Sequence, residues 1–293
     1  MAKAKVNPVP KKPIKMATVA AKPKPVAGSD ALRAAYWQKP DDKALLRVHA
    51  DALEQAGDPR GTFIQLSMLE ARTAEQELAR EKLIKKNKGD LIGPARAFLR
   101  EVDFDADGLV GMARAEADKV IAGVKEISRL HPRLILTITS VKTEALAKQL
   151  GAISLGDIYL VDFGWLTGTH GGCRLTDKLL AALAPALAEV RHLELSFSEL
   201  HNSPTPAGLM HLAQHAKKLR FLAADYHPTS NCAPATAYVP ALRAFPALKA
   251  VEWPSMQATD LPGIKVNALL GDDEDINGLL RVDTAAKVES LFA

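Results

Sequence analysis

Apolar residues recur from residue 99 onward in a short phrase, with three large apolar positions at i, i+3 and i+5. A related alternating segment, Leu134-Leu136-Ile138, lies between the first two copies. Apolar positions this closely spaced predict strands. The copies of the phrase are Leu99-Val102-Phe104, Leu155-Ile158-Leu160, Val190-Leu193-Leu195, Leu219-Leu222-Ala224, Leu248-Val251-Trp253 and Leu261-Ile264-Val266.

Segments with helical periodicity separate these strands, at 112–129, 143–150, 176–189, 205–217 and 236–245. Strands and helices that alternate at about 30-residue spacing predict parallel strands joined by helical crossovers. Leu195, Ala224 and Trp253 end consecutive phrases and are 29 residues apart, as in a long leucine-rich repeat. A doubly wound sheet would need a Gly-rich phosphate turn, which is not evident. We therefore predict an α/β fold, a short irregular leucine-rich-repeat solenoid.

The segment 39–98 predicts helical hairpins instead. Asp41 is expected to cap a helix with the apolar stripe Leu45, Val48, Ala52 and Ala56. Gly57 suits the left-handed position after that helix, and Asp58-Pro59 prevents continuation. Thr62 with Gln65, and Thr73 with Gln76, have capping-box spacing. The second box precedes a charged helix that is expected to end near 87–89.

Charge divides the chain into a basic tail and a nearly neutral body. Residues 1–30 contain seven lysines and one acid, or +6, which leaves 31 bases and 33 acids, or −2, for the other 263 residues. The tail has no aromatic residue and is expected to be disordered. We predict a tail at 1–34, a helical domain at 35–95 and the repeats at 96–293. A last helix near 284–292 would close the far end of the solenoid.

The stretch 41–66, DDKALLRVHADALEQAGDPRGTFIQL, resembles the repeat-companion domain of large-genome bacteria such as planctomycetes and myxobacteria, which usually precedes leucine-rich repeats. No enzymatic activity is attached to that family, so the resemblance implies a helical cap. Arg60 would form a fork with Asp51, Glu54 or Asp58. Departures from the family pattern are His49, Ala52 and Thr62. The shared residues are Ala50-Asp51, Leu53-Glu54, Gly57-Asp58-Pro59-Arg60-Gly61 and Phe63-Ile64.

Metal chemistry is only weakly suggested. The run 103–108, DFDADG, opens like a calcium loop, but Arg114 stands where the loop needs a glutamate. A second partial match to a calcium loop begins at 273–278, and it has Thr284 at the position where the loop needs a glutamate. His211 and His215 are one helical turn apart, yet Leu212 replaces the glutamate of a zinc-hydrolase helix. We expect polar turns and a solvent-facing helix, without a metal or other cofactor.

Catalysis has one candidate, Cys173 activated by His170 and oriented by Asp177. A loop insertion explains the same segment more simply, so we expect no enzyme. Cys173 and Cys232 do not form a disulfide framework. The sequence also lacks a signal peptide and an apolar run of membrane-spanning length. These features favour a cytoplasmic protein without a membrane partner.

The remaining expectation concerns a partner. In leucine-rich strands the residues that alternate with the consensus positions face the concave surface. We expect this acidic strip to bind another protein through a basic or amphipathic segment, with the chain's own lysine tail as an alternative occupant. Nucleic acid held by residues 3–24 is the alternative function. The strip includes Glu101, Asp103, Asp105, Asp157, Tyr159, His192, Glu194, Ser196, Phe221, Ala223, Ala250 and Glu252.

Overall fold

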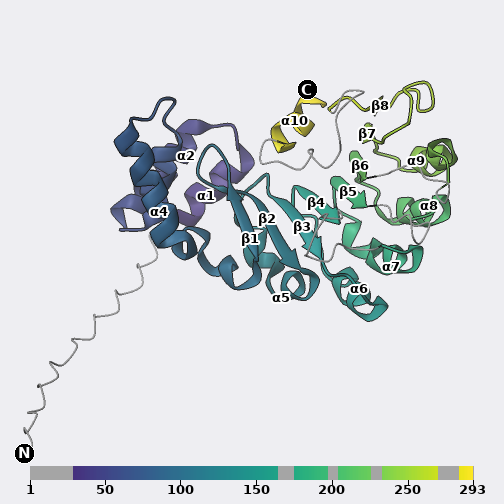
Figure 1. Ribbon diagram of the computed structural model, residues 1–293, viewed down its shortest axis with the longest axis horizontal. Helices are drawn as coiled ribbons and strands as arrows, with labels where there is room; N and C mark the ends of the chain where they lie inside the picture. The colour runs from purple at the N-terminus through teal and green to yellow at the C-terminus, as the bar shows by residue number, and fades with distance from the viewer. Residues whose placement is uncertain (1–28, 164–174, 197–203, 226–232, 270–283, 293) are drawn as a thin grey trace, which may run out of the picture.

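The computed structural model describes residues 29–163, 175–196, 204–225, 233–269 and 284–292. Eight strands in these residues form one sheet whose order, β1 to β8, follows the chain. Strands β2 to β8 are parallel, and β1 pairs antiparallel with β2. The molecule is therefore an α/β protein with a mostly parallel sheet (Figure 1).

Each predicted strand phrase coincides with a strand or adjoins one, but the prediction missed β2. That segment was expected to begin the helix at 112–129, and it pairs with β1 and β3 instead. The expectation of purely parallel strands is therefore also wrong at β1. The strands are β1 (Glu101–Phe104), β2 (Val110–Glu116), β3 (Ile135–Thr139), β4 (Leu160–Phe163), β5 (His192–Ser196), β6 (Phe221–Asp225), β7 (Ala250–Glu252) and β8 (Lys265–Val266).

The helices that follow these strands lie on one side of the sheet, each packed against the next (Figure 1). Threonine caps start three of them, and the Asp177 carboxylate accepts from Thr205 N at 2.7 Å, which ties α7 to α8. No helix in the described ranges has the length and apolar character needed to cross a membrane. The helices are α5 (Ala117–Ile127), α6 (Glu144–Gly151), α7 (Asp177–Leu183), α8 (Pro206–His215) and α9 (Val239–Arg243), with 3-10 turns η2 (Ala184–Leu187) and η4 (Ala235–Tyr238).

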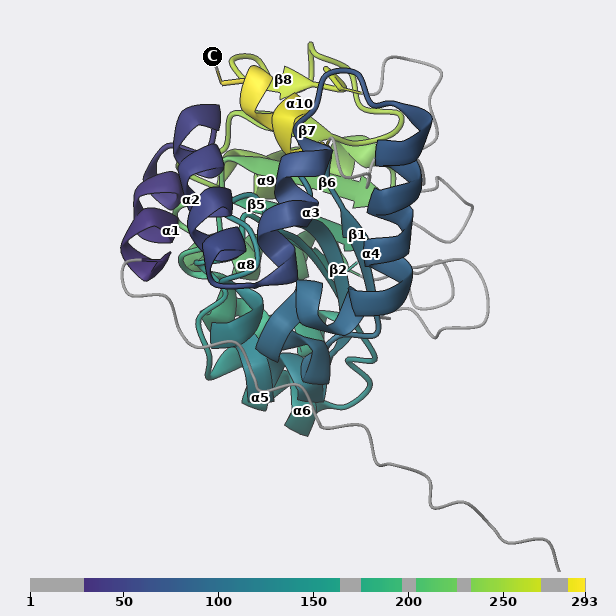
Figure 2. The ribbon, with the colours of Figure 1, turned by 90° about the vertical axis from the view of Figure 1, so that its left-hand side faces the viewer.

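Helices also form before the sheet, as predicted for 39–98, and they stand beside β1 at one end of the sheet (Figure 2). Asp42, not Asp41, caps α2, because its side chain accepts from Ala44 N and Leu45 N. The buried stripe of α2 is shifted accordingly, and Val48 is 49% exposed. These elements are α1 (Ser29–Gln38), α2 (Lys43–Gln55), α3 (Pro59–Ser67), α4 (Ala74–Ile92) and the 3-10 turn η1 (Gly93–Phe98).

The GDPRG turn joins α2 to α3 through local contacts. Gly57 has φ +74°, as its predicted left-handed position requires. Asp58 caps α3, and Arg60 donates to its two carboxylate oxygens at 2.5–3.0 Å, so Asp58 is the partner among the three acids predicted for this arginine. A Cβ on Gly61 would lie 2.4 Å from Glu54 N, so only glycine permits the close approach of α2 and α3. These contacts assign the turn a structural role.

The two predicted capping boxes have opposite outcomes. Thr62 and Gln65 lie inside α3, which starts at Pro59, so that box is wrong. Their side chains instead donate to Glu54 and to Asp51 on α2. The Thr73–Gln76 box is confirmed, with reciprocal bonds of 2.9 and 3.3 Å.

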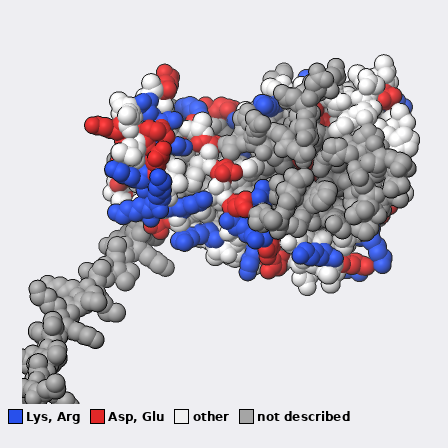
Figure 3. All heavy atoms as spheres, viewed as in Figure 1, with Lys and Arg blue, Asp and Glu red and all other residues white. Residues whose placement is uncertain are grey.

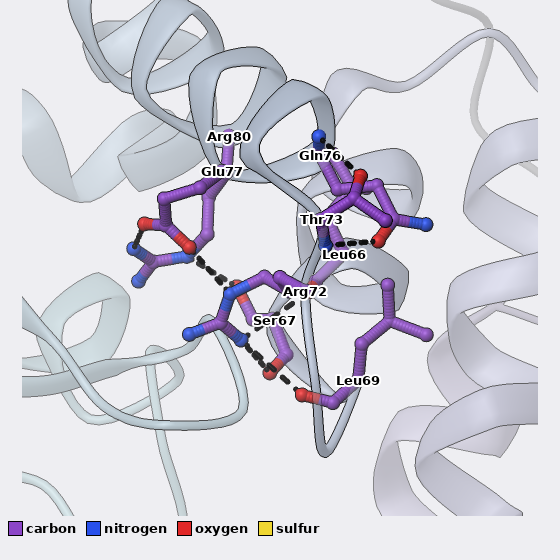
Figure 4. Close-up of polar contacts among 8 residues, drawn as sticks. All are labelled: Leu66, Ser67, Leu69, Arg72, Thr73, Gln76, Glu77 and Arg80. Carbon is purple, nitrogen blue, oxygen red and sulfur yellow. Dashed lines mark hydrogen bonds and ion pairs between the residues drawn. The ribbon is translucent and has the colours of Figure 1, made fainter.

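Arginines beside the confirmed box fix the turn between α3 and α4 (Figure 4). Arg72 donates to the Ser67 carbonyl at 2.9 Å and to Glu77 at 2.5 Å, and Arg80 donates to Ser67 Oγ at 3.1 Å. Helix α4 then continues past its predicted end to Ile92, with a non-helical residue at Asn87.

Candidate functional site

The side of the sheet opposite helices α5 to α9, here called the strand face, has a second, smaller apolar cluster. Side chains alternate as predicted: Leu193 and Leu222 join the helix-side core, whereas Phe221 and Ala223 join this second cluster. Adjacent strands align one row across the face, consisting of Met112, Ile135, Leu160, His192, Phe221 and Ala250.

A short C-terminal helix, α10 (Thr284–Ser290), covers this row (Figure 1). Val288 and Leu291 are buried in the same cluster as Ile135, Leu160 and Phe221. The prediction that this segment closes the far end of the solenoid is therefore wrong. Its apolar side matches the apolar row of the strand face, and burying both removes more apolar surface from water.

Phe292, two residues after α10, packs between an aromatic ring and a guanidinium group. Its ring stacks on His192, with centroids 5.9 Å apart and planes 18° apart. The Arg220 guanidinium lies 4.2 Å from the centroid of the same ring. Two more contacts hold the segment, because the Tyr159 hydroxyl donates to Ala285 O at 3.1 Å and Lys265 Nζ donates to Leu291 O at 2.5 Å. The strand face thus holds the C-terminal segment by apolar burial, by stacking and by hydrogen bonds, and we call the part of it that this segment covers, around Leu160, His192 and Phe221, the groove.

His192 is 2% exposed at the centre of this groove. Its Nδ1 lies 2.9 Å from the Tyr159 carbonyl and must carry the proton, since a carbonyl only accepts. Among the described residues no donor reaches Nε2. Burial lowers the pKa of His192 to about 4. Burial, followed by the Glu289 carboxylate, raises the pKa of Tyr159. Both rings are therefore neutral at pH 7.

The predicted partner-binding strip is closed to solvent along β5 to β7. His192, Glu194, Phe221 and Glu252 are 2%, 4%, 0% and 0% exposed. Glu101 and Asp103 on the edge strand are exposed, and Tyr159 is half-buried. The alternation that assigned these residues to one face was right, but the inference that this face is open was wrong. Sequence alternation carries no information about what covers a face.

Polar residues form a second aligned row on the strand face. Arg114, Thr137, Asp162 and Glu194 are successive partners across β2 to β5, and Ala223 continues the row to Glu252. Asp162 is 0% exposed, and Glu252 accepts from Leu269 N at 2.9 Å. Buried carboxylates require such partners, so this row is part of the folded interior.

A cavity of about 690 Å³ lies beside α10, between α1, the β1–β2 turn and the start of β3. Tyr36, Ala285 and Ala286 line it, together with ion pairs formed by Arg133 with Asp41 and by Lys43 with Asp107. These pairs connect the N-terminal helices to the sheet.

His131 in this cavity contacts Asp105 and has no free ring nitrogen. Its Nε2 lies 2.9 Å from Asp105 Oδ2, and its Nδ1 accepts from Arg133 N at 2.8 Å. The other Asp105 oxygen accepts from Asp107 N and Leu109 N, so this acid forms a hairpin turn. That geometry explains the DFDADG run without calcium. His131 therefore orders the turn and is not placed as a general base.

The other chemical candidates remain predictions. Residues 3–24, His170, Cys173, Cys232 and the second calcium-like run at 273–278 lie outside the described residues. The rings of His211 and His215 are 5.1 Å apart on α8. No group of three metal-binding side chains occurs within the described parts of the chain. No protein-family model, curated protein or solved structure matches the chain.

Proposed function

We propose that the protein is a non-catalytic scaffold that binds a helical segment of another protein in the groove now occupied by α10. The observation that carries this proposal is the seating of Phe292 between His192 and Arg220 on an apolar row. A short helix that inserts an aromatic anchor into a groove is a common mode of peptide recognition.

A leucine-rich-repeat solenoid is the architecture that fits this proposal. The strand order follows the chain, and the helices share one side of the sheet, which supports stacked strand–helix repeats. The repeat-companion resemblance at 41–66 belongs to the same proposal. Its GDPRG turn is a compact structural element, as a capping domain requires.

The chain's own α10 would act as a competitor of the partner. Fourteen residues, 270–283, join α10 to the last described residue of the sheet region. Because α10 belongs to the same chain as the groove, its competition with a separate partner is intramolecular. A partner present at micromolar concentration would therefore displace α10 only if it made stronger contacts with the groove than α10 does, or if the docking of α10 were itself weakened.

A competition experiment tests this function with the full-length protein. A fluorescent peptide TAAKVESLF should bind a Leu291→Asp, Phe292→Ala chain at least tenfold more tightly than the wild type, because the internal competitor is weakened. The matched control, Leu69→Asp with Leu78→Ala, alters exposed apolar residues of the N-terminal helices and should bind like the wild type. Equal affinity in all three chains, measured by fluorescence anisotropy, would rule out the groove as a recognition site.

A further inference from the structure

Basic residues line the end of the groove where strands β5 to β8 begin. Arg191, Arg220 and Lys249 directly precede β5, β6 and β7, and Lys265 is the first residue of β8. Backbone bonds link them: Arg220 N donates to Arg191 O at 2.7 Å, and Lys249 N donates to Arg220 O at 2.9 Å. Lys265 N in turn donates to Lys249 O at 2.9 Å. We call these four residues the basic edge.

The basic edge concentrates like charge at the surface. Arg191, Lys249 and Lys265 are exposed, and Arg220 is half-buried. Within the described residues, the neighbouring ion pairs of Arg133 with Asp41 and of Lys218 with Glu189 use none of the four. Arg191, Arg220 and Lys249 are successive neighbours on strands about 4.8 Å apart, and like charges so placed disfavour each other unless an opposite charge binds between them. Lys265 is one position out of this row, because it aligns with Ala250.

The C-terminal end of α10 meets this edge. Arg220 lies over Phe292, and Lys265 donates to the carbonyl of Leu291, the first residue after α10. Any residue that follows the aromatic anchor of a bound helix therefore starts among these basic side chains.

We propose that the basic edge binds an acidic segment that follows the groove-binding helix of a partner protein. This inference rests on the proposed function and specifies the partner's chemistry, an aromatic anchor followed by two or more carboxylates. It reverses the expectation of a basic partner, because Glu194 and Glu252 on β5 and β7 are buried, whereas the exposed charges at the beginning of β5, β7 and β8 are positive.

A nucleic acid fits this edge less well than an acidic peptide. Four adjacent strands span only about 14 Å, which is the reach of two phosphates or of a short peptide. Proteins that bind single-stranded nucleic acids in a groove usually also offer aromatic rings on which the bases stack. The rings beside the edge, of His192 and Phe221, are buried beneath the helix and its Phe292.

The test compares two labelled peptides on the full-length Phe292→Ala chain. One peptide is TAAKVESLF followed by four glutamates, and the other carries four glutamines instead. The glutamate peptide should bind roughly tenfold more tightly at low salt, and the difference should shrink at 0.5 M salt. The double charge reversal Arg191→Glu with Lys249→Glu should abolish this difference in affinity between the two peptides. The matched charge reversal Lys82→Glu with Lys86→Glu, on exposed positions of α4, should preserve it.

The outcomes separate the two proposals. If both peptides bind equally, the basic edge has no role in recognition, but the groove function stands. If neither peptide binds a chain that melts like the wild type, the groove function fails, and this inference fails with it. If a labelled dT20 oligonucleotide binds more tightly than the glutamate peptide and loses affinity in the Arg191→Glu, Lys249→Glu chain, the edge binds phosphates and the peptide assignment is wrong.

Discussion

The two faces of the sheet are covered in different ways. The helix side packs against α5 to α9, each of which lies between two strands in the chain and contributes to one continuous apolar core. The strand face packs, within the described residues, against α10 and the two residues after it, near the C-terminus, and against Leu269. The first cover cannot leave without disrupting the connections between the strands. The second is a separate helix whose removal leaves every strand connection intact.

On the proposed function, the helix side is buried permanently, whereas the cover of the strand face exchanges with a partner. Figure 3 shows Lys and Arg side chains, with Asp and Glu side chains among them, over the N-terminal helices and along the lower side of the molecule. The strand face instead combines apolar side chains with buried carboxylates. A recognition surface needs to be available part of the time, and a single short helix allows that at a lower energetic cost than five interleaved helices.

Removing a buried side chain from each face gives the largest expected contrast. Leu195→Ala, in the helix-side core, should lower the free energy of unfolding by about 2–5 kcal/mol because it leaves a cavity. Leu291→Ala, beside α10, should change that free energy by less than about 1 kcal/mol, because α10 opens locally. Urea unfolding measures both. Equal losses would mean that α10 belongs to the global folding unit.

Lowering the pH should make the docking of α10 on the strand face less favourable by up to about 3 kcal/mol. His192 has a pKa of about 4 when buried, against 6.5 when free, so the covered state binds fewer protons between these values. The stabilisation is complete above pH 6.5 and is lost as the pH falls toward 4. Arg191, Arg220 and Glu289 are the charged groups that act on the ring.

Hydrogen exchange of the α10 amides measures this effect. Protection should fall between pH 6.5 and 5 after correction for intrinsic exchange rates. In a His192→Gln chain it should stay constant over that range. A wild-type profile as flat as that of the variant would show that His192 does not titrate with opening.

The smallest expected effect is the loss of one hydrogen bond. Tyr159→Phe removes the hydroxyl that donates to Ala285 O, which should weaken α10 docking by about 1 kcal/mol. Exchange of the α10 amides should then accelerate about fivefold, with no change on the helix side. A parallel acceleration in amides of β5 would show that the two faces are not independent.

Local signals explain how much of this structure the sequence predicted. The Thr73–Gln76 box, the left-handed Gly57 and the strand phrases depend on residues within a few positions of each other, and all were recovered. The helix predicted from residue 112 failed because pairing of 110–116 with β1 and β3 overrode its local pattern. The basic edge had a signal, since a basic residue follows the first apolar position in three phrases at Arg191, Arg220 and Lys249.

The sequence by itself therefore determined the α/β class, the sequential strand and helix elements and the two-sided alternation of each strand. Only the tertiary structure decided that the acidic strip is buried along β5 to β7, that α10 covers the strand face and that Arg191, Lys249 and Lys265 are exposed beside it. Alternation assigns a side chain to a face of the sheet, because successive Cβ atoms point to opposite sides. Whether that face meets solvent depends on a segment more than ninety residues away from His192 in the chain, and its docking is driven by apolar area that no local pattern encodes.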